Sequence, residues 1–269
     1  MCGVCGCSPS VNSVPNKTVV DVYEKILSSN DILAARNRQL LDKHNILCLN
    51  LMSSPGSGKT SLLEATIEQL KDQYRIAVIE GDLETENDAK RIRDKGVQAI
   101  QIVTGSACHL EADMVFSALQ KLDLEAIDIL FIENVGNLVC PASFDLGHHR
   151  NITLLSTTEG DDKPAKYPVM FRAADICLIT KSDLLDYLDD FDTQQAEKNL
   201  RQLANVAPCI SLSSRQPASL KAWLHLLIQT KQQHELALTN QKTFLPKMQN
   251  QGAALHKETH YEPTSTVLA

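Results

Sequence analysis

The chain of 269 residues contains no apolar run that approaches the roughly 20 residues a helix needs to cross a bilayer. Its N-terminus lacks the basic segment and apolar core of a secretory signal peptide. It also has no excess of basic residues: the formal net charge is −7, whereas general nucleic-acid binding requires a concentrated basic face. We therefore expect a cytoplasmic protein that binds neither membranes nor nucleic acid.

Cysteine, in contrast, is abundant, with eight residues. In the reducing cytoplasm, free thiols and metal ligands are commoner than structural disulfides. Three of the cysteines lie in apolar, strand-like runs and are interpreted as core residues: Cys48, Cys177 and Cys209. The others are candidates for metal binding: Cys2, Cys5 and Cys7 in the opening MCGVCGC, and Cys108 and Cys140.

Short apolar runs alternate with amphipathic helical stretches along most of the chain. The runs lie near residues 46–52, 75–81, 99–103, 127–133, 152–157, 175–180 and 208–212. Such alternation indicates βαβ units, which build a mostly parallel sheet covered by helices on both faces. The sequence therefore predicts an α/β fold.

The predicted segments are residues 1–18 (cysteine motif and linker), 19–45 (N-terminal helix), 46–231 (main domain) and 232–269 (polar, mobile tail). Asn30 and Asn37 share the apolar stripe of the N-terminal helix, so this helix either packs on the main domain or offers a surface to a partner. In the tail, His234, His256 and His260 lack the spacing of metal ligands and are predicted to be solvated.

The stretch NLMSSPGSGKTSLL follows the first predicted strand, opens a helix and fits a P-loop. In such a loop, backbone amides wrap the phosphates, Lys59 reaches the β/γ oxygens and the Thr60 hydroxyl binds Mg²⁺. Ser53 stands where the first glycine is usual, so the match is one residue short. The nucleotide-binding residues predicted from this loop are Pro55, Gly56, Ser57, Gly58, Lys59, Thr60 and Ser61.

The late strand in ICLITKSD ends in Thr180-Lys181-Ser182-Asp183, which resembles the guanine-reading NKxD motif. The Asp183 carboxylate would accept hydrogen bonds from N1–H and the 2-amino group of guanine, and adenine offers neither donor. GTP is therefore the predicted nucleotide. Thr180 replaces the usual Asn, so a contact that braces the loop or reads the base is expected to be lost. Ser211, in SLSSR, is a weaker candidate for contact with the base.

Two further loops complete a predicted nucleotide switch. IENVGN resembles the DxxG element that senses the γ-phosphate, with Glu133 in place of Asp and Gly136 leaving room for its amide. EGDLET follows the second strand, and Asp82 is the carboxylate predicted to serve Mg²⁺ directly or through water. Lys59, Thr60, Asp82, Glu133 and Gly136 are the predicted catalytic residues. Because no obvious Gln follows Gly136 and no Arg finger is evident, hydrolysis of GTP to GDP and phosphate should be slow.

A second set of candidate ligands follows the third and fourth predicted strands. Cys108 and His109 lie in TGSACHLEADM, and Cys140 lies in ENVGNLVCP. Both loops leave the carboxyl edge of a parallel sheet, where the nucleotide also binds. Three N/S ligands suit Zn²⁺ or Ni²⁺ but leave a tetrahedral set incomplete, and a water or a second copy of the chain could complete it. The alternative is that Cys108 and Cys140 are unrelated buried thiols.

Together, the P-loop, EGDLET, CHLEADM, ENVGNLVCP and TKSDLL resemble the HypB family of hydrogenase nickel-incorporation GTPases over about residues 20–230. The resemblance implies a dimeric P-loop domain of the SIMIBI class and a GTP-dependent metallochaperone that delivers Ni²⁺ to [NiFe]-hydrogenase. It also implies a homodimer promoted by GTP, and two partners, the nickel chaperone HypA and the hydrogenase large subunit. The implied ligands are Cys2, Cys5 and Cys7 for a tight nickel site, and Cys108, His109 and Cys140 for a Ni²⁺ or Zn²⁺ site in the GTPase domain, residues 46–231.

Four other interpretations stay open. A urease-type nickel GTPase is the nearest, although the chain has CPAS and no Cys-Pro-His run. An accessory GTPase for cobalamin enzymes would leave the leading cysteines unexplained. A nickel or zinc storage or sensing module would bind metal regardless of nucleotide, but His-rich tracts are missing. An ATP-dependent kinase would need adenine preference and an acceptor pocket, for which the sequence gives no signal.

Overall fold

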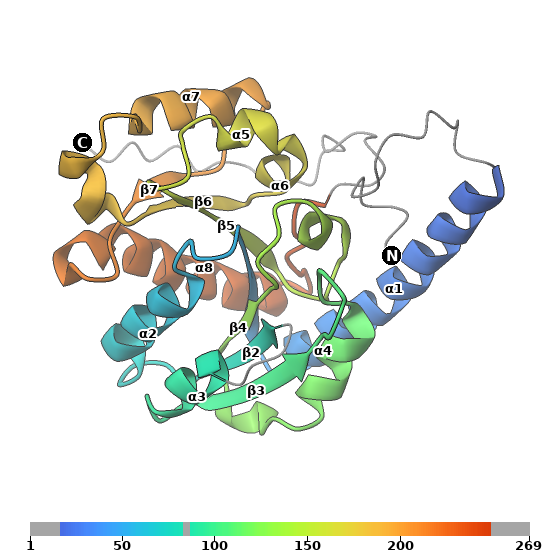
Figure 1. The fold of residues 1–269 in the computed structure, drawn as a ribbon. Coiled ribbons are helices and arrows are strands. Elements are labelled where there is room, and N and C mark those ends of the chain that lie inside the picture. Colours follow the sequence, from blue (N-terminus) through green and yellow to red (C-terminus); the bar gives the residue numbers. More distant parts are fainter. Residues whose placement is uncertain (1–16, 83–86, 249–269) are drawn as a thin grey trace.

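Residues 17–82 and 87–248 are described by a computed structural model of the chain (Figure 1). Its strands form one parallel sheet in the order β3-β2-β4-β1-β5-β6-β7, which confirms the predicted α/β fold. The strands are β1 (Leu47–Met52), β2 (Ile76–Asp82), β3 (Gln98–Val103), β4 (Ile129–Glu133), β5 (Arg150–Ser156), β6 (Ile176–Thr180) and β7 (Cys209–Ser211). Each coincides with a predicted apolar run to within about two residues.

Helices cover both faces of the sheet (Figure 1). They are α1 (Lys17–Lys43), α2 (Lys59–Leu70), α3 (Asn87–Arg93), α4 (Ala112–Leu119), α5 (Lys163–Lys166), α6 (Pro168–Arg172), α7 (Thr193–Gln202) and α8 (Lys221–Thr239). Short 3₁₀ helices lie at Leu124–Ala126, Cys140–Ser143, Ser182–Tyr187 and Pro217–Leu220. Among the described residues, no helix is long and apolar enough to cross a membrane.

The central strand β1 is buried on both faces, which explains its nearly continuous apolar sequence. Leu47, Leu49 and Leu51 face a core that includes α2 and α8. Cys48, between them, faces a second core that includes α4 and the end of α1. On the first face, the only tryptophan of the chain, Trp223, is buried, and its indole N–H donates to Thr66 Oγ1 at 3.0 Å. 

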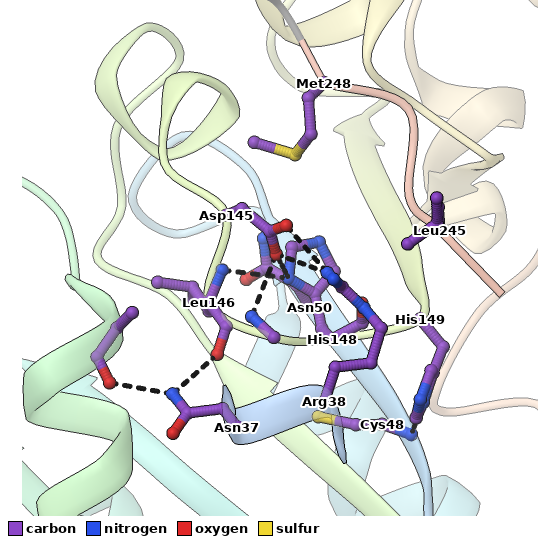
Figure 2. Close-up of polar contacts among 12 residues, drawn as sticks. Asn37, Arg38, Cys48, Asn50, Asp145, Leu146, His148, His149, Leu245 and Met248 are labelled. Atoms are coloured by element: carbon purple, nitrogen blue, oxygen red, sulfur yellow. Dashed lines mark hydrogen bonds and ion pairs between the residues drawn. The ribbon is translucent and has the colours of Figure 1, made fainter. Parts of the chain in front are cut away.

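The two asparagines on the apolar stripe of α1 fasten this helix to the main domain. Asn37 Nδ2 donates to the carbonyl oxygens of Ala112 (2.8 Å) and Leu146 (3.0 Å), as Figure 2 shows for Leu146. Asn30 Nδ2 donates to Asp145 O at 2.8 Å, and Asn30 Oδ1 accepts from Ala112 N at 2.9 Å. Of the two roles left open for this helix, packing on the domain is therefore observed from Asn30 onward.

A buried ion pair reinforces the same contact. Arg38 donates from Nη2 to both carboxylate oxygens of Asp145, at 2.6 and 2.7 Å, and from Nε to His148 O at 3.2 Å (Figure 2). Although burial alone would raise it, the Arg38 guanidinium holds the pKa of Asp145 below its usual value. Gly147 lies against the helix, since a Cβ there would come within 2.6 Å of Ala34 O. The helix is therefore held by an ion pair at Asp145 and by close backbone packing at Gly147.

The last helix continues past residue 231, where the sequence analysis places the start of a mobile tail. α8 ends at Thr239, and the segment that follows packs on the amino ends of β5 and β6: Asn151 Nδ2 donates to Lys247 O at 2.8 Å. The prediction of a mobile tail is therefore wrong for residues 232–248. Gln, Glu, Lys, Ala and Leu are strong helix formers, so a polar composition there did not mean an absence of structure. Residues 249–269, with His256 and His260, lie outside the described residues.

Candidate nucleotide and metal site

The P-loop joins β1 to α2 and places the first amides of the helix at the carboxyl edge of the sheet. Gly56 and Gly58 have φ values of 75° and 94°, in the left-handed region that favours glycine, which explains their place in this loop. Gly58 is the residue before the first turn of α2. Open N–H groups at the start of a helix form an anion site, so this loop can cradle phosphates.

Ser53, which replaces the usual glycine, adds a contact inside the P-loop. Its hydroxyl accepts a hydrogen bond from Lys59 Nζ at 3.1 Å and donates to Ser54 O at 2.7 Å. Both Ser53 and Lys59 are buried. The departure from the usual pattern therefore orients the lysine within the loop and does not disrupt it.

Thr180, where the base-reading motif usually has Asn, braces the P-loop directly. Its hydroxyl donates to Ser57 O at 2.7 Å. The bracing contact that the sequence analysis expected Thr180 to lose is therefore present. The Ser57 hydroxyl in turn contacts Glu159 Oε1 at 2.7 Å. Sequence reasoning missed Glu159, although its position just after β5, at the carboxyl edge of a parallel sheet, is a signal that could have identified it.

The two predicted base-reading loops lie side by side. Ser182 N donates to Leu212 O at 3.1 Å, which ties the loop with Asp183 to the loop that follows Ser211. Lys181 adopts a left-handed conformation with φ 59°, and its carbonyl accepts from Thr157 Oγ1 at 2.9 Å. Asp183 is half-buried at the start of the following turn.

Two buried glutamates lie beside Thr60. Thr60 Oγ1 donates to Glu133 Oε1 at 3.0 Å, and Glu133 is paired in register with Glu80 across β4 and β2. The Glu80 and Glu133 side chains contact each other, and burial raises the pKa of both; the charge of Glu133 raises the pKa of Glu80 further. Among the described residues, Glu80 Oε1 and Glu133 Oε2 have no hydrogen-bond partner.

These oxygens fit a divalent cation. Mg²⁺ prefers one or two carboxylates together with phosphate oxygens and a hydroxyl, and the Glu133 carboxyl group, which contacts that of Glu80, lies next to the Thr60 hydroxyl. Asp82, the carboxylate chosen from sequence, is half-buried at the end of the same strand, two residues beyond Glu80. Sequence reasoning missed Glu80 because a single acid in an apolar strand gains meaning only from its neighbour on β4. Residues 83–85 of EGDLET lie outside the described residues.

The switch loop packs against the P-loop at Gly136. A Cβ on Gly136 would lie 2.9 Å from both Cα and N of Pro55, which is too close for any side chain. The glycine thus allows the IENVGN loop and the phosphate-binding loop to touch. Any movement of one loop must be accommodated by the other.

The three residues predicted to bind metal in this domain come together. Cys108 Sγ lies 3.2 Å from Cys140 Sγ and 3.6 Å from His109 Nδ1. All three ligand atoms lie within 4.8 Å of one another. Ligands of one tetrahedral Zn²⁺ lie about 3.4–3.8 Å apart, given bonds of about 2.1–2.3 Å, so the spacing suits a metal ion. Cys108 and Cys140 are therefore not unrelated thiols.

The surroundings of His109 fix the orientation of its imidazole and favour its neutral form. It stacks on Phe144, with ring centroids 3.9 Å apart and planes at 24°. Burial lowers its pKa, which favours the neutral form that binds metals. Its Nε2 lies 3.5 Å from Glu111 Oε1. The ring thus has a defined orientation, with Nδ1 toward Cys108.

A second cluster of possible ligands comprises Asp42, His149 and His234. His234, predicted to be solvated, is fully buried, and its Nε2 lies 3.3 Å from Asp42 Oδ1; His149 Nε2 lies 3.1 Å from the same oxygen. Cys48 N donates to His149 Nδ1 at 2.9 Å, so neutral His149 carries its proton on Nε2, where a metal would have to bind. This cluster links α1 to α8 and to the residue that precedes β5 by hydrogen bonds, and it does not fit a metal.

The remaining cysteines lie either within the sheet or outside the described residues. Cys48 and Cys177 are buried in the core, as predicted, and Cys209 is half-buried beside Cys177 in the sheet. Cys2, Cys5 and Cys7, the predicted tight nickel site, lie outside the described residues.

The chain is similar to proteins of known families. Residues 47–211 match the family described as "CobW/HypB/UreG, nucleotide-binding domain". The hydrogenase maturation factor HypB of Rhizobium leguminosarum bv. viciae is 48% identical over 219 residues, which cover 80% of this chain and 73% of the relative. The hydrogenase/urease maturation factor HypB of Helicobacter pylori is 46% identical over 231 residues, covering 84% of this chain and 94% of the relative.

Two solved structures are similar throughout the domain. The crystal structure of HypB from Helicobacter pylori in complex with nickel superposes with a TM-score of 0.73 at 46% identity, covering 76% of this chain and 96% of that one. The crystal structure of the hydrogenase maturation factor HypB from Archaeoglobus fulgidus gives a TM-score of 0.71 at 35% identity, covering 76% of this chain and 100% of that one.

Proposed function

The chain belongs to the HypB family of hydrogenase maturation factors, and from this membership we propose that it is a GTP-hydrolysing metallochaperone. In this role it binds Ni²⁺ and assists its insertion into [NiFe]-hydrogenase during maturation. One observation carries the proposal: Cys108, His109 and Cys140 converge at the sheet edge that also holds the P-loop. A relative of 46% identity has been crystallised in complex with nickel.

The nucleotide is GTP. The half-buried Asp183 carboxylate matches the two adjacent donors of guanine, and a base without them would leave it unpaired. Thr180 keeps this loop in register with the P-loop through its bond to Ser57 O. The base-reading and phosphate-binding loops are thus held as one unit.

Hydrolysis uses electrostatic stabilisation and positioning. Lys59 and the amides of the P-loop bind the β- and γ-phosphates, and the Gly136 amide faces the γ-phosphate. Thr60 and Glu133, with Glu80 and Asp82 nearby, would hold Mg²⁺, which would neutralise charge on the phosphates. Because no residue in this arrangement supplies an arginine finger, the intrinsic rate is slow.

The cargo is a nickel ion, with zinc as the second ion that the same ligands accept. Three ligands from one chain leave a coordination position for a water or for a second copy of the chain. We assign the completing ligands to a GTP-promoted homodimer. Cys2, Cys5 and Cys7 form a separate, tighter nickel site in the N-terminal motif.

The partners are the nickel chaperone HypA and the hydrogenase large subunit, and the compartment is the cytoplasm. Urease is a second possible acceptor, because the Helicobacter pylori relative carries a name that includes urease maturation. A storage or sensing module is the competing function, in which metal binding ignores the nucleotide.

Paired titrations test the proposal. Ni²⁺ is titrated into the full chain with GDP and with a non-hydrolysable GTP analogue, and GTP hydrolysis is measured in parallel. The proposal expects two classes of nickel site, slow GTP turnover and a nickel affinity that differs between the nucleotides. Lys59→Ala is the control, since it should abolish turnover by removing phosphate stabilisation. Nickel binding that is identical with both nucleotides would favour storage.

A further inference from the structure

The loop that carries Cys108 and His109 is anchored at the next residue, Leu110. Leu110 is fully buried, and its side chain packs directly on Gly81 of β2, where a Cβ would lie 2.8 Å from Leu110 Cδ1 and Cγ. Its backbone N–H donates to Asn134 Oδ1 at 3.3 Å. Both anchoring contacts therefore reach the two segments predicted to bind Mg²⁺ and the γ-phosphate, EGDLET and IENVGN.

Asn134 is held at the centre of this joint. It is 1% exposed, its Oδ1 also accepts from Val135 N at 3.0 Å, and its Nδ2 donates to Asn50 Oδ1 at 3.1 Å. Its own backbone N–H donates to Leu51 O on β1, at 3.0 Å. The side-chain contacts fix the amide in one orientation, with Oδ1 toward Leu110, and the backbone bond holds the residue against β1.

The neighbours of Asn134 in the chain are the groups that face the nucleotide. Glu133 accepts from Thr60 Oγ1, and Gly136 packs on Pro55 of the P-loop. Cys140 follows on the same loop, in the turn Cys140–Ser143. The sequence alone gives no reason for Cys108 and His109 to follow a movement of this loop, but the bond from Leu110 N to Asn134 Oδ1 supplies one.

We propose that Asn134 is a positioning residue that transmits the nucleotide state to the metal ligands, by tying the Cys108-His109 loop to the switch loop at Leu110. The inference rests on the proposed function. When the switch loop moves onto a γ-phosphate, Asn134 carries Leu110 with it, so that both halves of the ligand set shift together. Without this bond, only Cys140 would respond.

The test is a metal titration of the full chain in which Cys2, Cys5 and Cys7 are replaced by Ser, so that the Cys108, His109 and Cys140 site is the one measured. Ni²⁺ is titrated with GDP and with a non-hydrolysable GTP analogue, and the nickel–thiolate absorption reports both affinity and geometry. The parent protein should show affinities that differ about 5- to 150-fold, the range of typical coupling. Asn134→Ala should bring the two affinities and the two spectra close together, while binding of the GTP analogue changes by less than about threefold.

Two further variants separate positioning from general damage to the fold. Asn134→Asp keeps an oxygen where Leu110 N–H donates, so it should retain the nucleotide response. Asn50→Ala removes the acceptor of Asn134 Nδ2 but leaves Leu110 N and Val135 N donating to Asn134 Oδ1, so it should retain the response while losing stability. If Asn134→Ala does not fold, Gly81→Ala displaces Leu110 from the other side and should also reduce the ratio of the two affinities.

The outcomes distinguish a failure of the coupling between nucleotide and metal from a failure of the role assigned to Asn134. Equal nickel affinities in the parent protein would overturn the proposed coupling, and the role of Asn134 with it. A parent ratio that survives in folded Asn134→Ala, or in Gly81→Ala, would overturn the role of Asn134 and leave the proposed function intact. Loss of the response in Asn50→Ala as well would show that the effect is a general loss of packing and would also overturn it.

Discussion

Thr60 Oγ1 and Glu133 Oε1 lie 3.0 Å apart, so the P-loop and the switch loop touch through one hydroxyl and one carboxyl group. Glu80 lies directly beside this contact on the neighbouring strand. Two buried carboxyl groups at the same point repel each other when both are ionised. Burial and the charge of Glu133 raise the pKa of Glu80 to about 11, so Glu80 stays protonated near neutral pH, and a bound divalent cation would favour ionisation of both groups.

Glu80→Gln should stabilise the Mg²⁺-free protein. Burial and Glu133 raise the pKa of Glu80 in the folded state, so folding stability falls as the pH rises above the usual glutamate value of about 4.5. Gln does not ionise, and each kcal/mol recovered at pH 8 raises the melting temperature by about 2–4 °C in a domain of this size. Thermal unfolding in EDTA measures this. With Mg²⁺ and GTP the advantage should reverse, and hydrolysis should need more Mg²⁺. A lower melting temperature in EDTA would contradict the assignment.

Asp183→Asn should exchange the base preference. The amide no longer accepts from both guanine donors, so GTP binding weakens, whereas the Asn amide N–H matches the 2-oxo group of xanthine. Leaving buried polar groups unmatched costs as much as about 10⁴-fold in discrimination. Competition between GTP and xanthosine triphosphate for the variant measures the change. Full retention of GTP preference would show that Asp183 does not read the base.

Deletion of residues 1–7 should remove the tighter nickel site and leave GTP hydrolysis nearly unchanged, because the Ser-, Pro- and Asn-containing stretch 8–18 separates this motif from the GTPase domain in the sequence. Nickel titration and GTP turnover of the shortened chain give the two quantities. The reciprocal control is Cys108→Ala in the full chain, which should keep the tight site. If turnover fell in proportion to the lost nickel, the N-terminal motif would have to contact the GTPase domain.

Folding stability should decrease below neutral pH because two histidines are buried in neutral form. Burial lowers the pKa of His149 to about 3 and that of His148 to about 4. Between these values and about 6.5, the unfolded chain binds protons that the folded chain does not, so each group lowers the free energy of unfolding by about 1.4 kcal/mol per pH unit as the pH falls. Above pH 6.5 this loss is absent.

Urea unfolding between pH 7.5 and 5 measures this slope. His149→Gln should make the slope shallower, and His225→Gln, on the exposed side of α8, is the matched control that should leave it unchanged. Identical slopes in the parent protein and in His149→Gln would show that His149 does not titrate differently on folding.

The features that the sequence predicted correctly are those in which local pattern and burial agree. β1 is buried on both faces, so its apolar run predicts the strand directly. The glycines of the P-loop motif predict the loop, and in the structure they adopt the left-handed conformations that favour glycine. Cys108, His109 and Cys140 come together, as expected because both of their loops leave the carboxyl edge of a parallel sheet.

The missed features depend on residues far apart in the chain. Glu80 was overlooked because its significance comes from register with Glu133, and register is set by the whole sheet. The polar neighbours of His234 predict a solvated side chain, yet Asp42, 192 residues earlier in the sequence, contacts it. The Thr180 hydroxyl contacts a carbonyl, Ser57 O, and backbone acceptors leave no trace in a motif.

The close packing of α1 against Gly147 leaves no room for a side chain at that position. Gly147 has φ 89°, and a Cβ on it would collide with the backbone at Ala34 and Arg38. A homologous protein with a larger residue at this position cannot dock its N-terminal helix in the same way. The residue can thus serve as a one-letter marker of helix docking in sequences without structures. Conversely, Gly147→Ala should displace α1 from the main domain without a change to any residue of the nucleotide site.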